Sequence, residues 1–256
     1  MKTVRSERDG AIVRIWLARP KVRNAFNGEV VEQLGEAFTC LAADVRIVVL
    51  SGEGKAFCAG VDLGWMQRSV RFSEGENVRD AKALATLFNT IDTCPQAVIG
   101  RVNGAALGGG LGLIACCDMV VAADTARFGF TEARLGLVPA VISPYVIRKT
   151  GSGPLRRYFL TGELFGAHTA MGLGLVHKVV EPERLDQAVT DLTETVLKSG
   201  PSAVSEAKAL IRAVDNQRPE DVLDYTARTI ALTRVSPEGQ EGMAAFLQKR
   251  RPNWQP

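Results

Sequence analysis

The sequence has few of the residues that build metal sites and nucleic-acid interfaces. Its 256 residues include only two histidines, His168 and His177, and five cysteines that show no metal-ligand spacing. Thirty-one basic residues are nearly balanced by 28 acidic ones, and the basic residues are scattered along the chain. We therefore expect no metal and no nucleic-acid partner, since binding to nucleic acid needs a basic patch.

Long hydrophobic runs are also missing. The longest uncharged stretch, residues 102–117, is shorter than a membrane span and contains five glycines. Charged residues between Lys2 and Asp9 interrupt any secretory signal at the start of the chain. The odd number of cysteines is typical of reduced, mostly buried thiols. The sequence thus predicts a cytoplasmic protein without a membrane segment.

The remaining composition is that of an ordinary globular protein. Hydrophobic residues make up 46% of the chain and charged residues 23%, which excludes disordered and collagen-like classes. The length suits one large α/β unit or two domains. Ten of the 25 glycines lie in residues 52–64 and 100–112, so functional residues are expected in these two windows.

Strands and helices alternate over most of the chain. Short apolar runs indicate buried strands, and apolar residues at helical spacing indicate helices between them. We expect strands at residues 11–17, 45–50, 96–102 and 119–123, and helices following Asn27, over 81–91 and over 111–117. This alternation at irregular spacing predicts an α/β fold.

The C-terminal part is predicted to be helical only. Helices are expected over residues 185–197, 203–214 and 222–232, and from an N-cap at Ser236 to about Lys249. Their apolar faces exceed what a short module can bury alone. We therefore predict a site-bearing α/β core over residues 1–195 and a C-terminal helical oligomerisation module over residues 196–256.

Two glycine-rich turns, residues 56–63 and 103–110, each follow a predicted strand. Glycine lets a ligand approach the backbone closely. Backbone N–H groups at the start of a helix carry positive partial charge, so two that converge from two turns would form an oxyanion hole. Neither turn matches a phosphate-binding motif. Close packing of a helix on a sheet remains the competing use of these glycines.

Five segments, in order along the chain, resemble the crotonase (enoyl-CoA hydratase/isomerase) superfamily. They are residues 19–25, 56–63, 103–110, 128–139 and 242–250. The resemblance implies a spiral of repeated β-β-α units with the C-terminal helical module, assembled as a trimer or as a dimer of trimers. It implies an acyl-CoA thioester as substrate, and no cofactor beyond the coenzyme A of that substrate.

The resemblance also implies roles for individual residues. The backbone N–H groups of Val61 and Gly109 would form the oxyanion hole, and Glu132 would be the catalytic acid/base. Asp62 could instead serve as a helix N-cap, and Lys249 as a cation in the last turn of a helix. The residues expected to contact substrate or coenzyme A, the last two from a neighbouring subunit, are Val22, Arg23, Ala59, Asp62, Leu63, Phe246 and Lys249.

The acid–base pair of the family is incomplete in this chain. Family hydratases use two glutamates, and Gly112 stands at the first of the two positions. Glu132 stands at the second, where an apolar cleft would raise its pKa and let it shuttle a proton near neutral pH. Without such a cleft, Glu132 would be a surface acid that pairs with Arg134.

Several functions therefore stay open. Glu132 could perform both proton transfers of an enoyl-CoA hydratase, or move one proton in a Δ3,Δ2-enoyl-CoA isomerase. The chain could also be a non-catalytic acyl-CoA-binding protein or an RNA-binding protein. Residues 57–66 and 135–147 resemble hydratases of methylglutaconyl-CoA or isohexenylglutaconyl-CoA, which favours hydration. Such carboxylate-ended substrates need a basic partner, for which the candidates are Arg68, Arg79, Lys82 and Arg148.

Overall fold

The computed structural model describes residues 2–255, which form two compact units. The first unit extends to Cys94 and continues over residues 98–190, and the second contains residues 95–97 and the chain from Asp191 onward. The boundary between them falls inside helix α8 (Leu185–Leu197). The separate roles expected for residues 1–195 and 196–256 stay a prediction.

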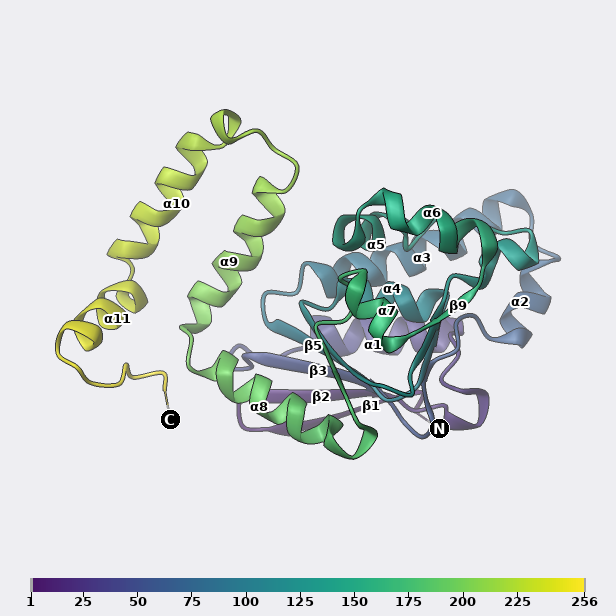
Figure 1. The fold of residues 1–256 in the computed structure, drawn as a ribbon, viewed down its shortest axis with the longest axis horizontal. Coiled ribbons are helices and arrows are strands. Elements are labelled where there is room, and N and C mark those ends of the chain that lie inside the picture. Colours follow the sequence, from purple (N-terminus) through teal and green to yellow (C-terminus); the bar gives the residue numbers. More distant parts are fainter. Residues whose placement is uncertain (1, 256) are drawn as a thin grey trace. The chain divides into compact units, whose positions relative to one another are not determined.

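The first unit is built on a six-stranded sheet (Figure 1). The first two strands of the sheet are antiparallel, and the strand pairs β2–β3, β5–β7 and β7–β10 are parallel. In sheet order the strands are β1 (Val4–Asp9), β2 (Ile12–Leu17), β3 (Ile47–Gly52), β5 (Ala97–Val102), β7 (Met119–Ala123) and β10 (Lys178–Val180). The four strands expected from apolar runs are confirmed.

Strand β1 was not expected, and its sequence explains why. Five of its six residues are exposed, and four of the six are charged. It lies at the edge of the sheet, where one neighbouring strand supplies the hydrogen bonds and no apolar face is required. A strand of this kind leaves no hydrophobic pattern in the sequence.

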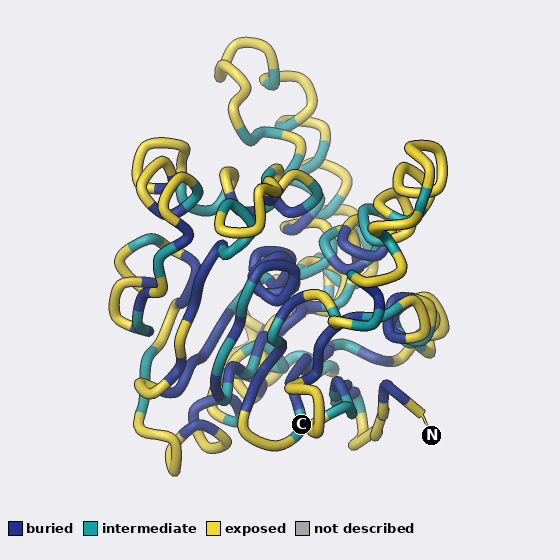
Figure 2. Tube along the Cα trace, turned by 90° about the vertical axis from the view of Figure 1, so that its right-hand side faces the viewer, coloured by how far each residue is buried: buried dark blue, intermediate teal, exposed yellow. Residues whose placement is uncertain are grey.

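Helices cover the large sheet and bury its apolar side (Figure 1, Figure 2). Helix α1 (Gly28–Thr39) begins at Asn27, whose side chain accepts a hydrogen bond from the Val30 N–H. Helix α3 (Glu74–Asp92) begins earlier than expected because Ser73 and Glu76 form a capping box. The other helices of this unit are α2 (Leu63–Ser69), α4 (Gly109–Cys116), α5 (Ser143–Thr150), α6 (Ser152–Thr161) and α7 (Ala167–Gly172).

A second, four-stranded sheet positions the two glycine-rich turns. Its strands, β4 (Ala56–Cys58), β6 (Ala105–Leu107), β8 (Arg127–Gly129) and β9 (Leu164–Gly166), have three residues each, too few to show a period in the sequence. Helix α2 follows β4 and helix α4 follows β6. Because β4 and β6 are parallel neighbours, both turns lie at the same edge of this sheet.

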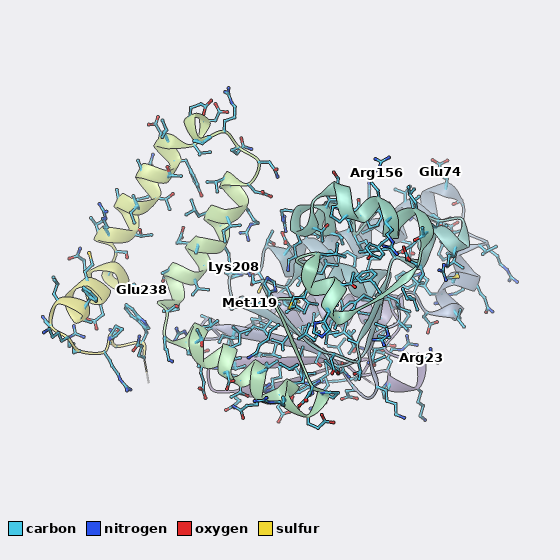
Figure 3. All side chains as sticks on the ribbon, in the orientation of Figure 1. Arg23, Glu74, Met119, Arg156, Lys208 and Glu238 are labelled. Carbon is cyan, nitrogen blue, oxygen red and sulfur yellow. The ribbon has the colours of Figure 1, made fainter. Side chains whose placement is uncertain are left out.

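The second unit is helical, as expected. Helices α9 (Pro201–Val214), α10 (Leu223–Val235) and α11 (Pro237–Leu247) follow one another, and Ser236 caps the last by accepting from the Gly239 N–H. Glu238 accepts hydrogen bonds from the backbone N–H groups of Ser202 and Ala203, which ties α11 to the start of α9 (Figure 3).

The cysteines are reduced and mostly buried, as their odd number suggested. All five cysteines are free thiols, and all but Cys40 are buried. Over residues 2–255, no helix combines the length and the apolar character that crossing a membrane requires. The same residues contain no cluster of three histidine, cysteine, aspartate or glutamate side chains suited to a metal ion.

Candidate active site

The two glycine-rich turns are in direct contact. A Cβ atom at Gly110 would lie 2.6 Å from the Cys58 carbonyl oxygen, and one at Gly60 would lie 3.1 Å from that of Leu107. Gly60 also has a φ of +89°, which side chains disfavour. Only glycine at these two positions lets the turns approach so closely. Close packing, one of the two uses that the sequence left open for these glycines, is therefore observed at both turns.

Two unpaired backbone donors lie in these turns. Val61 precedes helix α2 and is 40% exposed, and Gly109 is the first residue of helix α4. Neither the Val61 N–H nor the Gly109 N–H donates a hydrogen bond to any residue from 2 to 255. Free donors at helix starts, held in two touching turns, are suited to stabilise a developing oxyanion.

Phe26 connects the two donors. Its backbone N–H donates to the Gly60 carbonyl at 2.7 Å, and its carbonyl accepts from the Asp62 N–H at 2.8 Å. Its ring packs against Gly109, where a Cβ atom would lie 2.9 Å from the ring atom Cε2. Phe26 was not predicted as a site residue, although it directly follows the matched segment 19–25.

The Glu132 carboxyl lies against the second turn. Glu132 is in the short 3₁₀ helix η2 (Thr131–Leu135), and its Oε1 would be 3.1 Å from a Cβ atom at Gly108. Its Oε2 is buried and has no hydrogen-bond partner among residues 2–255. Burial raises the pKa of this carboxyl. Arg134 donates to the Thr161 carbonyl oxygen instead, so a Glu132–Arg134 pair is not observed in the described chain.

The raised pKa predicts a pH-dependent stability. A carboxyl whose pKa is higher in the folded than in the unfolded state favours folding most below its unfolded value, here about 4.5, and loses that contribution as pH rises through the folded value. Glu132→Gln does not titrate. We therefore expect the melting temperature of this variant, relative to wild type, to increase as pH rises from below 4.5 to neutrality. Thermal unfolding across this range tests it, and a constant difference contradicts it.

The position of the missing glutamate is occupied. A Cβ atom at Gly112 would lie 2.4 Å from Ile142 Cγ2 and 2.7 Å from Phe88 Cζ, and both of these residues are buried. The rings of Phe88 and Phe26 also meet edge to face, with centroids 6.4 Å apart. Gly112 is therefore required by the packing of two apolar side chains, and the site contains Glu132 without a second acid at this position.

Most residues predicted to contact coenzyme A lie together in the first unit. Val22 ends the 3₁₀ helix η1 (Pro20–Val22), and Arg23 is exposed at the edge of the unit (Figure 3). The Arg23 carbonyl accepts from the Ala59 N–H at 3.0 Å, which joins this loop to the first glycine turn. Leu63, at the start of helix α2, is 75% exposed.

Asp62 has the capping role that the sequence suggested. Its Oδ1 accepts from the backbone N–H groups of Gly64 and Trp65 at the start of helix α2. Phe246 and Lys249 belong to the second unit, where Phe246 is 83% exposed and Lys249 lies beyond the end of helix α11 with a φ of +54°. Their contact with coenzyme A stays a prediction.

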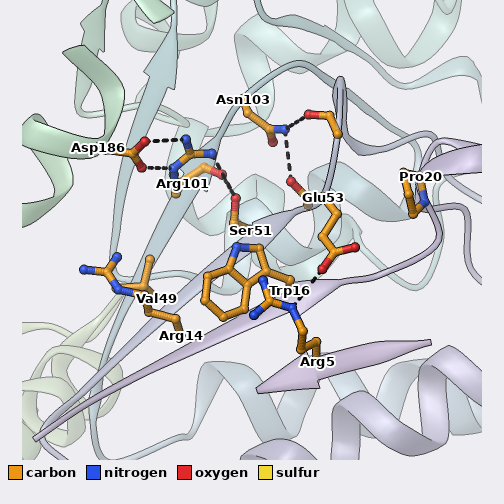
Figure 4. A pocket seen from close by; sticks show the side chains of 12 residues that line it. Arg5, Arg14, Trp16, Pro20, Val49, Ser51, Glu53, Arg101, Asn103 and Asp186 are labelled. Atoms are coloured by element: carbon orange, nitrogen blue, oxygen red, sulfur yellow. Dashed lines mark hydrogen bonds and ion pairs between the residues drawn. The ribbon is translucent and has the colours of Figure 1, made fainter. Parts of the chain in front are cut away.

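A separate cavity on the large sheet contains none of the predicted site residues (Figure 4). It has a volume of about 650 Å³ and lies beside Trp16, over which the Arg5 guanidinium stacks at 3.9 Å. Arg5 pairs with Glu53, and Arg101 pairs with Asp186. Arg14 is a third cation in the lining, so the two acids offset two of its three positive charges.

Known proteins match this chain over nearly its whole length. The family model described as enoyl-CoA hydratase/isomerase matches residues 7–256. A crotonyl-CoA hydratase of Syntrophomonas wolfei is 32% identical over 253 residues, which cover 97% of this chain and 96% of that protein.

Solved structures agree with this match. An enoyl-CoA hydratase from Shewanella pealeana superposes with a TM-score of 0.94 at 37% identity, covering 98% of this chain and 96% of that one. Pseudomonas aeruginosa AtuE gives a TM-score of 0.96 at 34% identity, covering 99% of this chain and 100% of that one. Sequence, fold and turn geometry together show that the chain belongs to the enoyl-CoA hydratase/isomerase family, the crotonase superfamily.

Proposed function

We propose that this chain is an enoyl-CoA hydratase that adds water to an α,β-unsaturated acyl-CoA. One observation carries the proposal: two unpaired N–H donors, at Val61 and Gly109, lie in touching turns, and the Glu132 carboxyl lies against the second of them. The donors would hold the thioester oxygen, and the carboxyl would move the proton. Besides water, this reaction needs nothing beyond the protein and the coenzyme A thioester itself, so no separate cofactor is proposed.

The reaction can proceed with one carboxyl. The ionised Glu132 takes a proton from water as the oxygen bonds to Cβ, and the π electrons move onto the thioester as an enolate. The Val61 and Gly109 N–H groups stabilise the negative charge that develops on the enolate oxygen. Glu132 then returns its proton to Cα. A raised pKa suits a group that must both accept and donate a proton near neutrality.

A second candidate function is Δ3,Δ2-enoyl-CoA isomerisation. The packing around Gly112 favours it, because Phe88 and Ile142 leave Glu132 without a second acid at that position. In this reaction Glu132 would take a proton from C2 of a 3-enoyl thioester and return it to C4. The enolate between the two transfers would use the same two N–H donors.

Two substrates separate these functions. A hydratase removes the conjugated absorbance of a 2-enoyl-CoA and incorporates one oxygen from ¹⁸O-labelled water. An isomerase creates that absorbance from a 3-enoyl-CoA without label. Turnover of the 2-enoyl-CoA with label supports our proposal, and isomerisation alone overturns it in favour of the second candidate. Binding of coenzyme A thioesters without either reaction would indicate a non-catalytic family member.

For the acyl group of the substrate we propose a chemical class, the branched glutaconyl type. A branched glutaconyl-type substrate would need a cation near its free carboxylate. Arg148, one of the four candidate cations, is bonded to Asp92, whose side chain is 10% exposed. Arg68, Arg79 and Lys82 remain for this role, so the proposed subgroup depends on them.

We also propose that the chain acts as a homo-oligomer, a trimer or a dimer of trimers, in the cytoplasm. The second unit supports assembly, because large apolar side chains stay exposed on its helices when it is considered by itself. These side chains are Leu223, Ile230, Leu232, Met243, Phe246 and Leu247. Sedimentation of the purified protein measures the mass of the particle and therefore the number of its subunits.

A further inference from the structure

An ion pair connects the loop expected to bind coenzyme A with the turn that carries Val61. Arg19 Nη2 contacts Asp62 Oδ2 at 3.0 Å, and the two side chains are only 20% and 16% exposed. Arg19 Nη1 donates to the Ala25 carbonyl at 2.6 Å, so one guanidinium bonds both segments. A pair shielded from water in this way is screened less by salt than a surface pair.

Asp62 uses its two oxygens for different tasks. Oδ1 caps helix α2 through the Gly64 and Trp65 N–H groups, and Oδ2 binds Arg19. Burial alone would disfavour the charged form, but the bonds from Trp65 and Arg19 outweigh it and hold the pKa of Asp62 below its ordinary value. Asp62 is therefore a carboxylate at neutral pH, and its direction is fixed from two sides.

Backbone hydrogen bonds on either side of Val61 reinforce this connection. The Ala59 N–H donates to the Arg23 carbonyl, and the Asp62 N–H donates to the Phe26 carbonyl. Val61 lies between these bonds, and its own N–H has no partner among residues 2–255. A shift of the loop over residues 19–26 must therefore change the direction of the free Val61 N–H.

We infer that Arg19 and Asp62 are positioning residues that couple the 19–26 loop to the oxyanion donor at Val61. Binding of the nucleotide end of a coenzyme A thioester to this loop aligns the Val61 N–H with the thioester oxygen. Binding energy from a remote, non-reacting part of the substrate then appears in kcat as well as in KM. This inference rests on the proposed function.

The test compares two thioesters that share one acyl group. One carries full coenzyme A, and the other carries pantetheine, which lacks the nucleotide. Asp62→Asn keeps a good N-cap and removes the charge that holds Arg19, and Arg19→Met removes the other partner. We expect each variant to lower kcat for the coenzyme A thioester roughly 10- to 100-fold, toward the kcat of the pantetheine thioester, which changes little.

A matched variant and a double variant complete the design. Arg101 is also 20% exposed and ion-paired, with Asp186, so Arg101→Met should keep the wild-type ratio of the two kcat values. The double variant Arg19→Met/Asp62→Asn should cost little more than either single change, because both remove one interaction. Thermal unfolding of each variant confirms that the compared proteins are folded.

The outcomes separate this inference from the proposed function. A selective loss of kcat with the coenzyme A thioester supports the coupling. Equal losses with both thioesters would show a purely structural pair, and unchanged kcat values would show no role; either result overturns the inference while the function stands. A wild-type protein inactive on both thioesters would overturn the proposed function and this inference with it.

Discussion

Glu132→Gln lowers kcat for hydration of a 2-enoyl-CoA by roughly 10²- to 10⁴-fold, the usual contribution of a general acid–base group. The substitution keeps the shape of the side chain beside Gly108. An amide, however, can neither take a proton from water nor return one to Cα. The backbone donors at Val61 and Gly109 are unaffected, so binding of the thioester should stay close to that of wild type.

Steady-state kinetics and titration with a saturated acyl-CoA measure these two effects separately. Glu163→Gln is a matched control, because Glu163 belongs to the same unit but is ion-paired with Arg157 on the surface. We expect this control to keep wild-type kcat. Full activity in Glu132→Gln would disprove the assigned role, and an equal loss in both variants would point to a general effect of removing a carboxylate.

Gly112→Glu, which restores the glutamate of the family pattern, should destabilise the protein and leave its activity no higher. Its Cβ would overlap Ile142 and Phe88, at 2.4 Å and 2.7 Å. Overpacking of a core costs about 1–3 kcal/mol, and the unpaired carboxyl at a fully buried helix position adds a further penalty. Because the space is already filled, the new carboxyl cannot reach a substrate without displacing these side chains.

Denaturant unfolding of four further variants identifies the cause of this effect. Gly112→Ala introduces the Cβ alone and should lose part of the stability. Phe88→Ala, made alone and added to Gly112→Glu, should give a double variant that loses less stability than the sum of the two single losses, because the truncated ring opens part of the overlapping space. Gly153→Ala is the control, since a Cβ there meets no atom within 4 Å. A Gly112→Glu protein as stable as wild type, with faster hydration, would contradict the packing argument.

Local patterns in the sequence predicted much of the fold. The sequence segments that form strands β3, β5 and β7 are mostly apolar because nearly all residues of these strands are buried. The amphipathic spacing after Asn27 and the N-caps at Asp62 and Ser236 also appear in the structure. In each case the signal and the structure depend on residues within a few positions of one another.

The candidate site was predicted only in part. Matched motifs indicated the two glycine turns and Glu132, and the structure brings the three together within one unit. Phe26, Phe88 and Arg19 were missed. Their roles come from contacts with residues far along the chain, such as Asp62 for Arg19, and a single sequence has no periodicity that reports such a pair.

The family, the α/β alternation and the lack of a glutamate at position 112 can all be predicted from the sequence alone. The meaning of the missing glutamate comes from the three-dimensional packing, because Phe88 and Ile142 reach Gly112 from other elements and fill the space beside it. The same packing leaves the Val61 and Gly109 N–H groups unpaired, and the Arg19–Asp62 ion pair connects the turn that carries Val61 to the loop over residues 19–26. Spacing along a chain fixes local structure, whereas a site forms only where distant segments pack together.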